Sequence, residues 1–289
     1  MKLQLSIYPS LFIIIALVTN LSAQDLTKPS PIPRIDSVFM EELTWMEIRD
    51  LIQEGSTNVI VATGGIEQNG PFVATGKHNY VLQATTEAIA RKLGNTLVAP
   101  IVKYVPEGTI SPPSGHMLYP GTISLSEATF ELLLIDISNS LKQHGFENIL
   151  FICDSGGNIQ GMKNVENRLN TAWQNEKAKI IYIDAYYNQD AWSFDFLKQI
   201  GVNQLPDIQT YLRQDIHSDY HYEAIMATID PALIRTKQRM KTGNYQINDF
   251  EMSPPEKTIE NGKKLIDYRA KITVDAIDKL IKKTDRISW

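Results

Sequence analysis

The chain has little cysteine, no excess of positive charge and few long apolar runs, and each shortage excludes a class of protein. Cys153 is the single cysteine among 289 residues, which excludes an internal disulfide and a zinc site built from four thiolates. Lysine and arginine number 28 against 33 aspartates and glutamates, a formal charge of −5. Because no surplus of cations is available to neutralise phosphates, we do not expect a nucleic-acid partner.

Two motifs of common enzyme classes are also missing. No Gly-x-Gly-x-x-Gly segment follows a predicted strand, which argues against dinucleotide binding. Asp154-Ser155-Gly156 invites comparison with a serine nucleophile, but position 153 is cysteine, so the Gly-x-Ser-x-Gly elbow is absent. The hydrophobic content of 43% is nevertheless that of an ordinary globular protein, and a sizeable core is expected.

The first residues have the layout of a secretory signal. Lys2 precedes the apolar stretch 11–18, and Ser22 and Ala23 supply small residues at a cleavage point. Since spanning a bilayer takes about 20 apolar residues, we expect residues 1–23 to be a cleaved signal peptide, the alternative being an uncleaved anchor. Cleavage removes Lys2 and no acidic residue, which changes the formal charge from −5 to −6. The mature protein would then be exported, periplasmic or extracellular, without a membrane attachment.

Short apolar runs and amphipathic stretches alternate along the rest of the chain. Residues 24–37, with three prolines, predict an extended lead-in, and residues 38–289 predict a single domain. The apolar runs predict strands, and apolar residues three and four apart predict helices. Strands are expected at 58–63, 96–102, 148–153 and 179–185, and helices at 80–93, 126–144, 159–175 and 258–284. Because parallel neighbours need a crossover connection, this order favours an α/β fold with a mostly parallel sheet.

Two of the predicted strands end in loops that combine carboxylates with glycines. Residues 64–71, Gly-Gly-Ile-Glu-Gln-Asn-Gly-Pro, follow the first strand, and residues 154–158, Asp-Ser-Gly-Gly-Asn, follow the third. Ligands collect at the carboxyl ends of parallel strands, and glycine lets the backbone approach a ligand closely. Glu67 and Asp154 are therefore candidates for binding a metal or a proton, although each could instead cap a turn.

These loops resemble those of the creatininase (creatinine amidohydrolase) family. The resemblance extends from about residue 43 to residue 262 and is carried by four ordered segments: Glu67-Gln68-Asn69-Gly70-Pro71, Gly76-Lys77-His78, Pro120-Gly121-Thr122-Ile123-Ser124-Leu125 and Gly156-Gly157-Asn158. His116 also falls where the family often has a histidine. The resemblance implies a three-layer α/β/α sandwich, a homo-oligomer, and metal-dependent hydrolysis of a cyclic amide or related C–N bond in a small polar substrate.

The metal of the family has a clear chemical purpose. Amide hydrolysis needs water that is nucleophilic near neutral pH and a positive centre facing the oxyanion, and a divalent ion held by carboxylates and imidazoles supplies both. Compared with the family pattern, Asn69 and Ser155 replace histidines and His78 replaces an aspartate. The resemblance therefore implies one divalent ion, zinc or manganese, held by Glu67, His78 and Asp154, and argues against a second. Alternatively, His78 is an exposed histidine at a helix start and Asp154 caps a strand end.

A later segment, 215–223, resembles the family's histidine-containing stretch ahead of a proline. His217 matches the family's histidine near the scissile bond, where an imidazole can pass a proton to the leaving nitrogen. Glu223 lies one place beyond the family's glutamate and is a second catalytic candidate. His221 shares a face with His217 if the stretch is helical, and without a helix the pairing means little. Each histidine could instead have an ordinary structural role. The remaining candidates for contacting substrate or supporting the ligands are Asn69, His116, Ser155, Asn158 and His221.

Two functions of different classes are consistent with these residues. The first is an exported, metal-dependent amidohydrolase of creatininase type. The second is a non-catalytic relative whose pocket binds a small ligand after the loss of metal ligands. Since fold and pocket would be shared, bound metal distinguishes the two.

Overall fold

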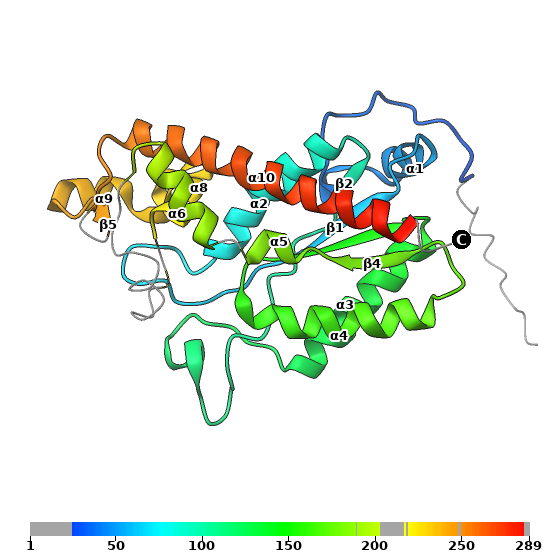
Figure 1. Cartoon of the computed structure of the whole chain (residues 1–289), viewed down its shortest axis with the longest axis horizontal. Helices are drawn as coiled ribbons and strands as arrows, with labels where there is room; N and C mark the ends of the chain where they lie inside the picture. The colour runs from blue at the N-terminus through cyan, green and yellow to red at the C-terminus, as the bar shows by residue number, and fades with distance from the viewer. Residues whose placement is uncertain (1–24, 189, 203–216, 218, 248–249, 286–289) are drawn as a thin grey trace, which may run out of the picture. The chain divides into compact units, whose positions relative to one another are not determined.

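The computed structural model describes residues 25–188, 190–202, 217, 219–247 and 250–285 (Figure 1). Residues 34–289 form one compact unit and residues 1–33 another. The expected signal peptide, 1–23, lies outside the described residues, and residues 25–33 contain turns and bends without a helix or strand. Within the described ranges, no helix combines the length and the apolar character needed to cross a bilayer.

A parallel sheet forms the centre of the larger unit. Its strands β1 (Asn58–Thr63), β2 (Thr96–Val98), β3 (Asn148–Cys153) and β4 (Lys179–Tyr182) are arranged in the order β2-β1-β3-β4. All three pairings are parallel, and Thr63 lies opposite Cys153 where β1 and β3 end. The central strand β1 is buried along its whole length, as expected for a parallel sheet covered on both faces.

Helices cover both faces of this sheet, which confirms the predicted α/β/α sandwich (Figure 1). On one face, Val59, Val61 and Phe151 pack in a core with residues of α1 (Trp45–Gln53), α3 (Glu127–Gln143) and α4 (Ile159–Ala172). On the other, Ile60 and Leu150 pack with α2 (Lys77–Leu93), α5 (Asp184–Tyr187) and α10 (Pro255–Asp285). The alternation of inward side chains along each strand thus supplies both layers of core.

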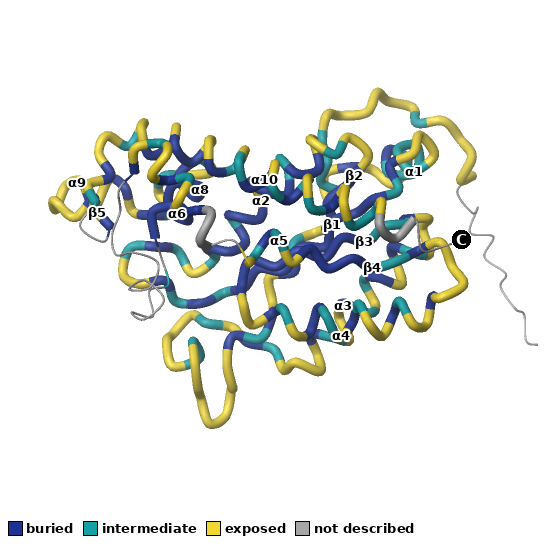
Figure 2. Tube along the Cα trace, in the orientation of Figure 1, coloured by how far each residue is buried: buried dark blue, intermediate teal, exposed yellow. Residues whose placement is uncertain are grey.

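A second core lies around α8 (Tyr220–Ile229). Tyr220 to Ala227 are all buried, and α8 packs against α10 and α2 (Figure 2). The same core includes residues from the short segments around it, namely α6 (Asp190–Gln199), η4 (Pro231–Ile234), β5 (Gln246–Ile247) and β6 (Phe250–Glu251), with α9 (Thr236–Thr242) between them. The sequence-derived candidates His221 and Glu223, both in α8, are therefore part of the protein interior.

The ends of several elements have identifiable causes. Thr44 and Glu47 form a capping box at the start of α1, and Ser126 accepts a hydrogen bond from the amide of Thr129 at the start of α3. α2 ends at Gly94, whose φ of +79° suits glycine. β2 ends at Val98, earlier than the predicted residue 102, because Pro100 has no N–H to donate to a sheet.

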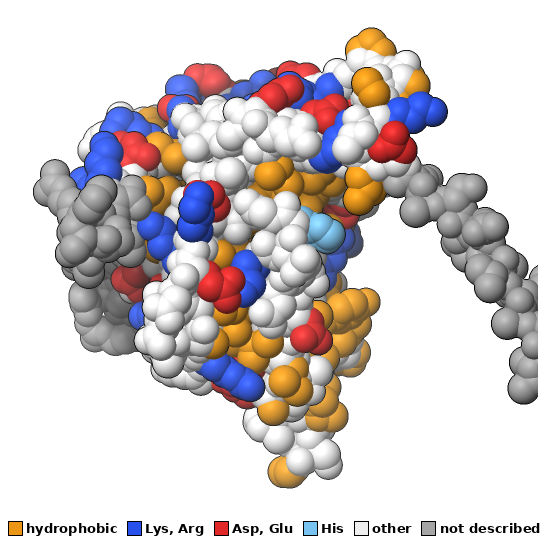
Figure 3. Space-filling view, turned by 90° about the vertical axis from the view of Figure 1, so that its right-hand side faces the viewer, with side chains coloured by type: hydrophobic (Ala, Val, Ile, Leu, Met, Phe, Trp, Pro, Cys, Tyr) orange, Lys and Arg blue, Asp and Glu red, His pale blue; other side chains and the backbone are white. Residues whose placement is uncertain are grey.

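Three short 3₁₀ segments, η1 (Met40–Glu42), η2 (Gly115–Leu118) and η3 (Gly156–Asn158), lie in the connections. On the face seen in Figure 3, acidic and basic side chains are interspersed, and the described residues drawn there form no broad positive patch.

Candidate functional site

Acidic and basic side chains meet where β1 and β3 end. Glu67 lies in the loop after β1, His78 in the first turn of α2, and Asp154 directly after β3. His78 Nε2 is 2.8 Å from Glu67 Oε1, and His78 Nδ1 is 2.8 Å from Asp154 Oδ2. All three side chains are buried. The structure therefore brings together the three residues that the sequence suggested as metal ligands.

The arrangement gives His78 a particular role. Each ring nitrogen of an imidazole can make one hydrogen bond. Both nitrogens of His78 face a carboxylate oxygen at 2.8 Å, so neither is directed at a free coordination position in this arrangement. His78 acts here as a bridge between Glu67 and Asp154.

Asp154 is also held from the opposite side by the long C-terminal helix. Arg269 of α10 donates from Nη2 to Asp154 Oδ1 at 2.7 Å, and the Tyr186 hydroxyl donates to the same oxygen at 3.3 Å. The Arg269 guanidinium lies 4.0 Å from the centre of the Tyr186 ring. Complete burial favours the neutral acid, but the charge of Arg269 and the hydrogen bond from His78 outweigh it and lower the pKa of Asp154. Asp154 therefore remains ionised.

Glu67 has different partners at its two oxygens. Oε1 faces His78 and also Lys77, whose Nζ is 3.4 Å away, whereas Oε2 is 3.1 Å from His116 Nε2. Burial opposes ionisation, but the hydrogen bond from His78 and the positive charge of Lys77 hold the pKa of Glu67 well below its usual range. The ammonium of Lys77 also donates to the carbonyl oxygen of His217.

Glu107 and His116 reach Glu67 from the connection between β2 and α3. The amide of Glu107 donates to Ser124 Oγ at 2.9 Å, and the amide of His116 donates to the Glu107 carbonyl at 3.1 Å, which fixes this connection. Ligand atoms of Glu67, Glu107 and His116 all lie within 4.8 Å of one another. Glu107 Oε1 and His116 Nδ1 are buried and have no hydrogen-bond partner among the described residues.

This second group of residues fits a divalent ion. Two carboxylates and one imidazole are suitable ligands for zinc or manganese, and buried polar atoms without partners gain from a bound cation. Burial raises the pKa of Glu107 to about 9, and the charge of Glu67 adds to the effect, so the carboxyl holds a proton that a cation can replace. Burial also lowers the pKa of His116, which favours the neutral form that binds metals.

Gly65 provides the space for Glu107. A Cβ atom at Gly65 would lie 1.8 Å from Glu107 Oε1, closer than any real contact. Gly64 next to it would similarly collide with the amide of Asn79, whose Nδ2 donates to the Gly65 carbonyl at 2.8 Å. The glycine pair after β1 thus allows side chains from two other segments to pack against this loop.

The amides among the predicted site residues stabilise the loops. Asn69 Nδ2 donates to the Glu67 carbonyl at 3.0 Å, and Asn158 Nδ2 donates to the Gly64 carbonyl at 2.9 Å. Ser155 is buried at the N-cap of η3. In the described part of the chain, the buried Oδ1 atoms of Asn69 and Asn158 have no hydrogen-bond partner. These residues support the loops that carry Glu67 and Asp154.

The three residues predicted from the later segment are placed differently from one another. The ring of His217 meets that of His116 edge-on, with centroids 4.4 Å apart, so His217 borders the cluster. His217 precedes α8, whereas His221 lies within it, with Nδ1 2.6 Å from Asp219 Oδ1. The helical pairing considered for the two histidines is therefore not formed.

Glu223 engages another part of the protein. Its carboxylate accepts a hydrogen bond from Arg239 of α9, and both side chains are buried. Arg239 also donates to the carbonyls of Asn244 at 3.0 Å and Gln246 at 2.7 Å. This ion pair joins α8 to the segment around β5.

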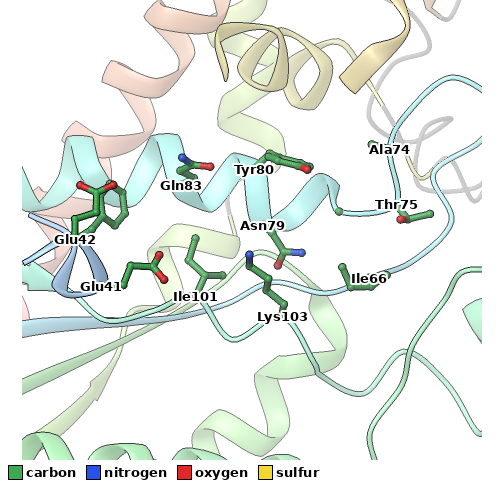
Figure 4. Close-up of a pocket in the computed structure, with 12 residues that line it drawn as sticks. Glu41, Glu42, Ile66, Ala74, Thr75, Asn79, Tyr80, Gln83, Ile101 and Lys103 are labelled. Atoms are coloured by element: carbon green, nitrogen blue, oxygen red, sulfur yellow. The ribbon is translucent and has the colours of Figure 1, made fainter. Parts of the chain in front are cut away.

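A pocket of about 450 Å³ lies beside the loop that follows β1, with Ile66 in its lining (Figure 4). Its lining combines charged and polar side chains from η1, α2 and the segment after β2, including Glu41, Glu42, Gln83 and Lys103. The candidate ligands Glu67, Glu107 and His116 are not part of that lining. The pocket in Figure 4 is therefore distinct from the proposed metal-binding group.

Comparison with known proteins agrees with this fold. A family model described as "Creatininase: Creatinine amidohydrolase" matches residues 41–275. The chain belongs to the creatininase family. The resemblance inferred from the loop residues is thereby confirmed.

Individual relatives of known name are only distantly similar to the chain. Creatinine amidohydrolase of Pseudomonas putida is 29% identical over 128 residues, 41% of this chain and 48% of that protein. A mycofactocin precursor peptide peptidase of Mycolicibacterium smegmatis is 28% identical over 109 residues, 36% of this chain and 41% of that protein. The chain thus spans about half the length or less of these curated relatives. A solved creatininase variant of "Zn-Zn type" has a TM-score of 0.58 at 20% identity, covering 86% of this chain and 99% of that one.

Sequence reasoning missed three members of the cluster in this creatininase-family protein. Lys77 belongs to the Gly76-Lys77-His78 motif, which gives no sign that its ammonium contacts Glu67. Glu107 lies in an irregular segment whose pattern predicts no helix or strand. Arg269 had a detectable signal, since it lies four residues after Leu265 and four before Thr273, both of which are buried on α10. An arginine on the buried face of an amphipathic helix requires a buried partner, and Asp154 provides it.

Proposed function

We propose that the protein is a metal-dependent hydrolase that cleaves a cyclic amide or related C–N bond in a small polar molecule. The observation that carries the proposal is the group of buried Glu67, buried Glu107 and partly buried His116, whose ligand atoms lie within 4.8 Å of one another. Membership of the creatininase family supports it. The names of related structures, creatininase of "Zn-Zn type" and "Creatininase Mn", suggest zinc or manganese.

Glu67, Glu107 and His116 would hold one divalent ion in place of the set Glu67, His78 and Asp154 suggested by the sequence. Three protein ligands leave an open position, as catalytic zinc sites require. When bound, such an ion polarises a carbonyl group and makes water acidic enough to attack near neutral pH. Glu107 would give up the proton that it holds in the metal-free protein.

A side chain of the protein would supply the proton that the leaving nitrogen takes up. Attack of water on the carbonyl carbon breaks the C–N bond only if the leaving nitrogen receives a proton. His217, whose ring lies against His116, is the group we assign to this transfer. Glu223 is ion-paired with Arg239, so we assign it a structural role instead. Lys77 keeps Glu67 ionised beside the reacting groups.

The substrate is proposed only as a class. The two curated relatives are a creatinine amidohydrolase and a peptide peptidase, and hydrolysis of a C–N bond is common to both names. A suitable panel therefore contains creatinine, other small cyclic amides and short peptides.

A non-catalytic, ligand-binding role is the second candidate. The observation in its favour is that Lys77, His78 and Arg269 already provide Glu67 and Asp154 with ionic or hydrogen-bonding partners without a metal. A protein of this kind would bind a small ligand and leave it unchanged.

Metal content and hydrolysis separate the two candidates. Protein purified without chelator should contain about one zinc or manganese per chain and hydrolyse at least one member of the panel. Glu107→Gln should lose both properties, while the matched control Glu256→Gln, at an exposed position at the start of α10, should keep both. Absence of metal together with binding but no turnover of a panel member would support the second candidate.

We also propose that the protein is exported and forms a homo-oligomer. Export rests on the signal-like residues 1–23. Self-association is supported by exposed apolar side chains in the connection that carries Glu107 and His116, namely Tyr104, Ile110, Leu118, Tyr119 and Ile123. Light scattering coupled to size-exclusion chromatography would measure the assembly.

A further inference from the structure

Three buried side chains with nitrogen donors surround the two ionised carboxylates of the cluster. Lys77, His78 and Arg269 are 2%, 5% and 4% exposed. They contact Glu67 and Asp154 at distances between 2.7 and 3.4 Å. A buried carboxylate normally requires a compensating positive charge, and here the protein supplies it from its own residues.

We propose that His78, Asp154 and Arg269 are positioning residues that orient Glu67 for a single divalent ion, and that Lys77 and His78 occupy the side of Glu67 where a second ion would bind. This inference rests on the proposed function, because it assumes that Glu67, Glu107 and His116 hold a metal. It assigns roles to four residues that are not themselves ligands.

The two oxygens of Glu67 show why only one ion fits. A carboxylate that bridges two metal ions uses one oxygen for each. Oε1 of Glu67 already contacts His78 Nε2 at 2.8 Å and Lys77 Nζ at 3.4 Å, whereas Oε2 faces His116. A second divalent ion at Oε1 would need the space in which His78 Nε2 and Lys77 Nζ already lie. The ion would have to displace both side chains.

The positioning role follows from a series of contacts that starts at Glu67 and ends at Arg269. Glu67 is fixed by His78, His78 by Asp154, and Asp154 by Arg269, which lies 115 residues further along the sequence. All four residues of this series are buried, so the orientation of the Glu67 carboxylate depends on all three contacts. Replacing a residue that contacts a metal ligand typically lowers metal affinity by about 10- to 100-fold.

Stoichiometry tests the single-ion part of the inference without any variant. The full chain is dialysed against an excess of zinc or of manganese, the free metal is removed, and bound metal is measured by elemental analysis and native mass spectrometry. One ion per chain is expected. Two ions per chain would overturn the inference.

Substitutions test the positioning part. Asp154→Asn removes the carboxylate that holds His78, and His78→Gln removes the imidazole that bridges Glu67 and Asp154. Calorimetric titration with zinc should show affinity reduced by about 10- to 100-fold in both variants, with the stoichiometry unchanged. Arg269→Lys keeps the positive charge, and its zinc affinity should fall less than that of Asp154→Asn or His78→Gln. The matched controls are Asp136→Asn on α3 and His144→Gln at its C-cap, both exposed, and these should bind zinc as the unmodified protein does.

Thermal unfolding of the metal-free variants separates positioning from general stability. A purely structural role would lower the melting temperature and leave the zinc affinity of the folded protein unchanged, and that result would overturn the inference. If His78→Gln does not fold, Asp154→Asn and Arg269→Lys still decide, since both are close in shape to the original residues.

The outcomes also distinguish this inference from the proposed function. One bound ion, weakened by the variants, with no hydrolysis of the panel would refute the proposed function and support the positioning roles. One bound ion, unaffected by the variants, with hydrolysis present would refute the positioning roles alone. Unmodified protein that binds no ion would refute both.

Discussion

Replacing Gly65 with alanine should displace the Glu107 carboxyl while leaving the protein folded. The new Cβ would lie 1.8 Å from Glu107 Oε1, whereas real contacts of this kind are at least 3.0 Å. The carboxyl must therefore move by more than an ångström. Because it is the end of a flexible side chain, rotation relieves the collision, and the change is expected in metal binding rather than in folding.

The size of the effect follows from what Glu107 does. As one of three proposed ligands, it should contribute more than a partner of a ligand, so zinc affinity should fall by at least about 10-fold. Positive φ at Gly65, +157°, adds backbone strain on the order of 1–3 kcal/mol to the free energy of unfolding.

Gly55→Ala is the matched control. Gly55 also has positive φ, +106°, but a Cβ there would meet nothing within 4 Å. Denaturant unfolding should show a comparable loss of stability in both variants, and calorimetric titration should show weakened zinc binding in Gly65→Ala alone. Equal zinc affinity in the two variants would refute the assignment of Glu107 as a ligand.

Three further predictions concern other parts of the chain. Burial raises the pKa of the Cys153 thiol to about 12, so a thiol reagent should label it only after denaturation, and rapid labelling of the native protein would contradict its burial. The pKa of Asp154 is lower in the folded protein than its ordinary value of 3.8, because Arg269 and His78 outweigh the effect of burial; the resulting stability is present above that pH and is lost as the pH falls below it. The unfolding free energy of Asp154→Asn should accordingly depend less on acid than that of the unmodified protein, and identical acid profiles would argue against this. Finally, sequencing of protein exported by a bacterial host should find Gln24 at the N terminus, and an intact Met1 would show that no signal peptide was removed.

Much of the fold could be predicted because it depends on local patterns. The run Asn58–Thr63 is apolar on both faces, which suits the centre of a parallel sheet, and the stretches that became α3 and α4 show apolar residues at helical spacing. Element ends were predicted less well. β4 ends at Tyr182 and not at residue 185, since Asp184 begins α5 instead of continuing the strand.

The site could be predicted only in part. Loops after neighbouring parallel strands must lie at one edge of the sheet, so the sequence could indicate that Glu67 and Asp154 approach each other. It could not indicate that His78 would stand between them with both nitrogens engaged, because that depends on how α2 is seated against the two loops.

The sequence by itself therefore determined the family, the alternation of strands and helices, and one carboxylate of the proposed site. The tertiary structure decided the rest: it added Glu107 from an irregular connection and Arg269 from the C-terminal helix. The physical reason is that patterns of local spacing report which face of an element is buried. The partner of a buried charge is chosen by packing between segments far apart in the chain, as Arg269 and Asp154 illustrate across 115 residues.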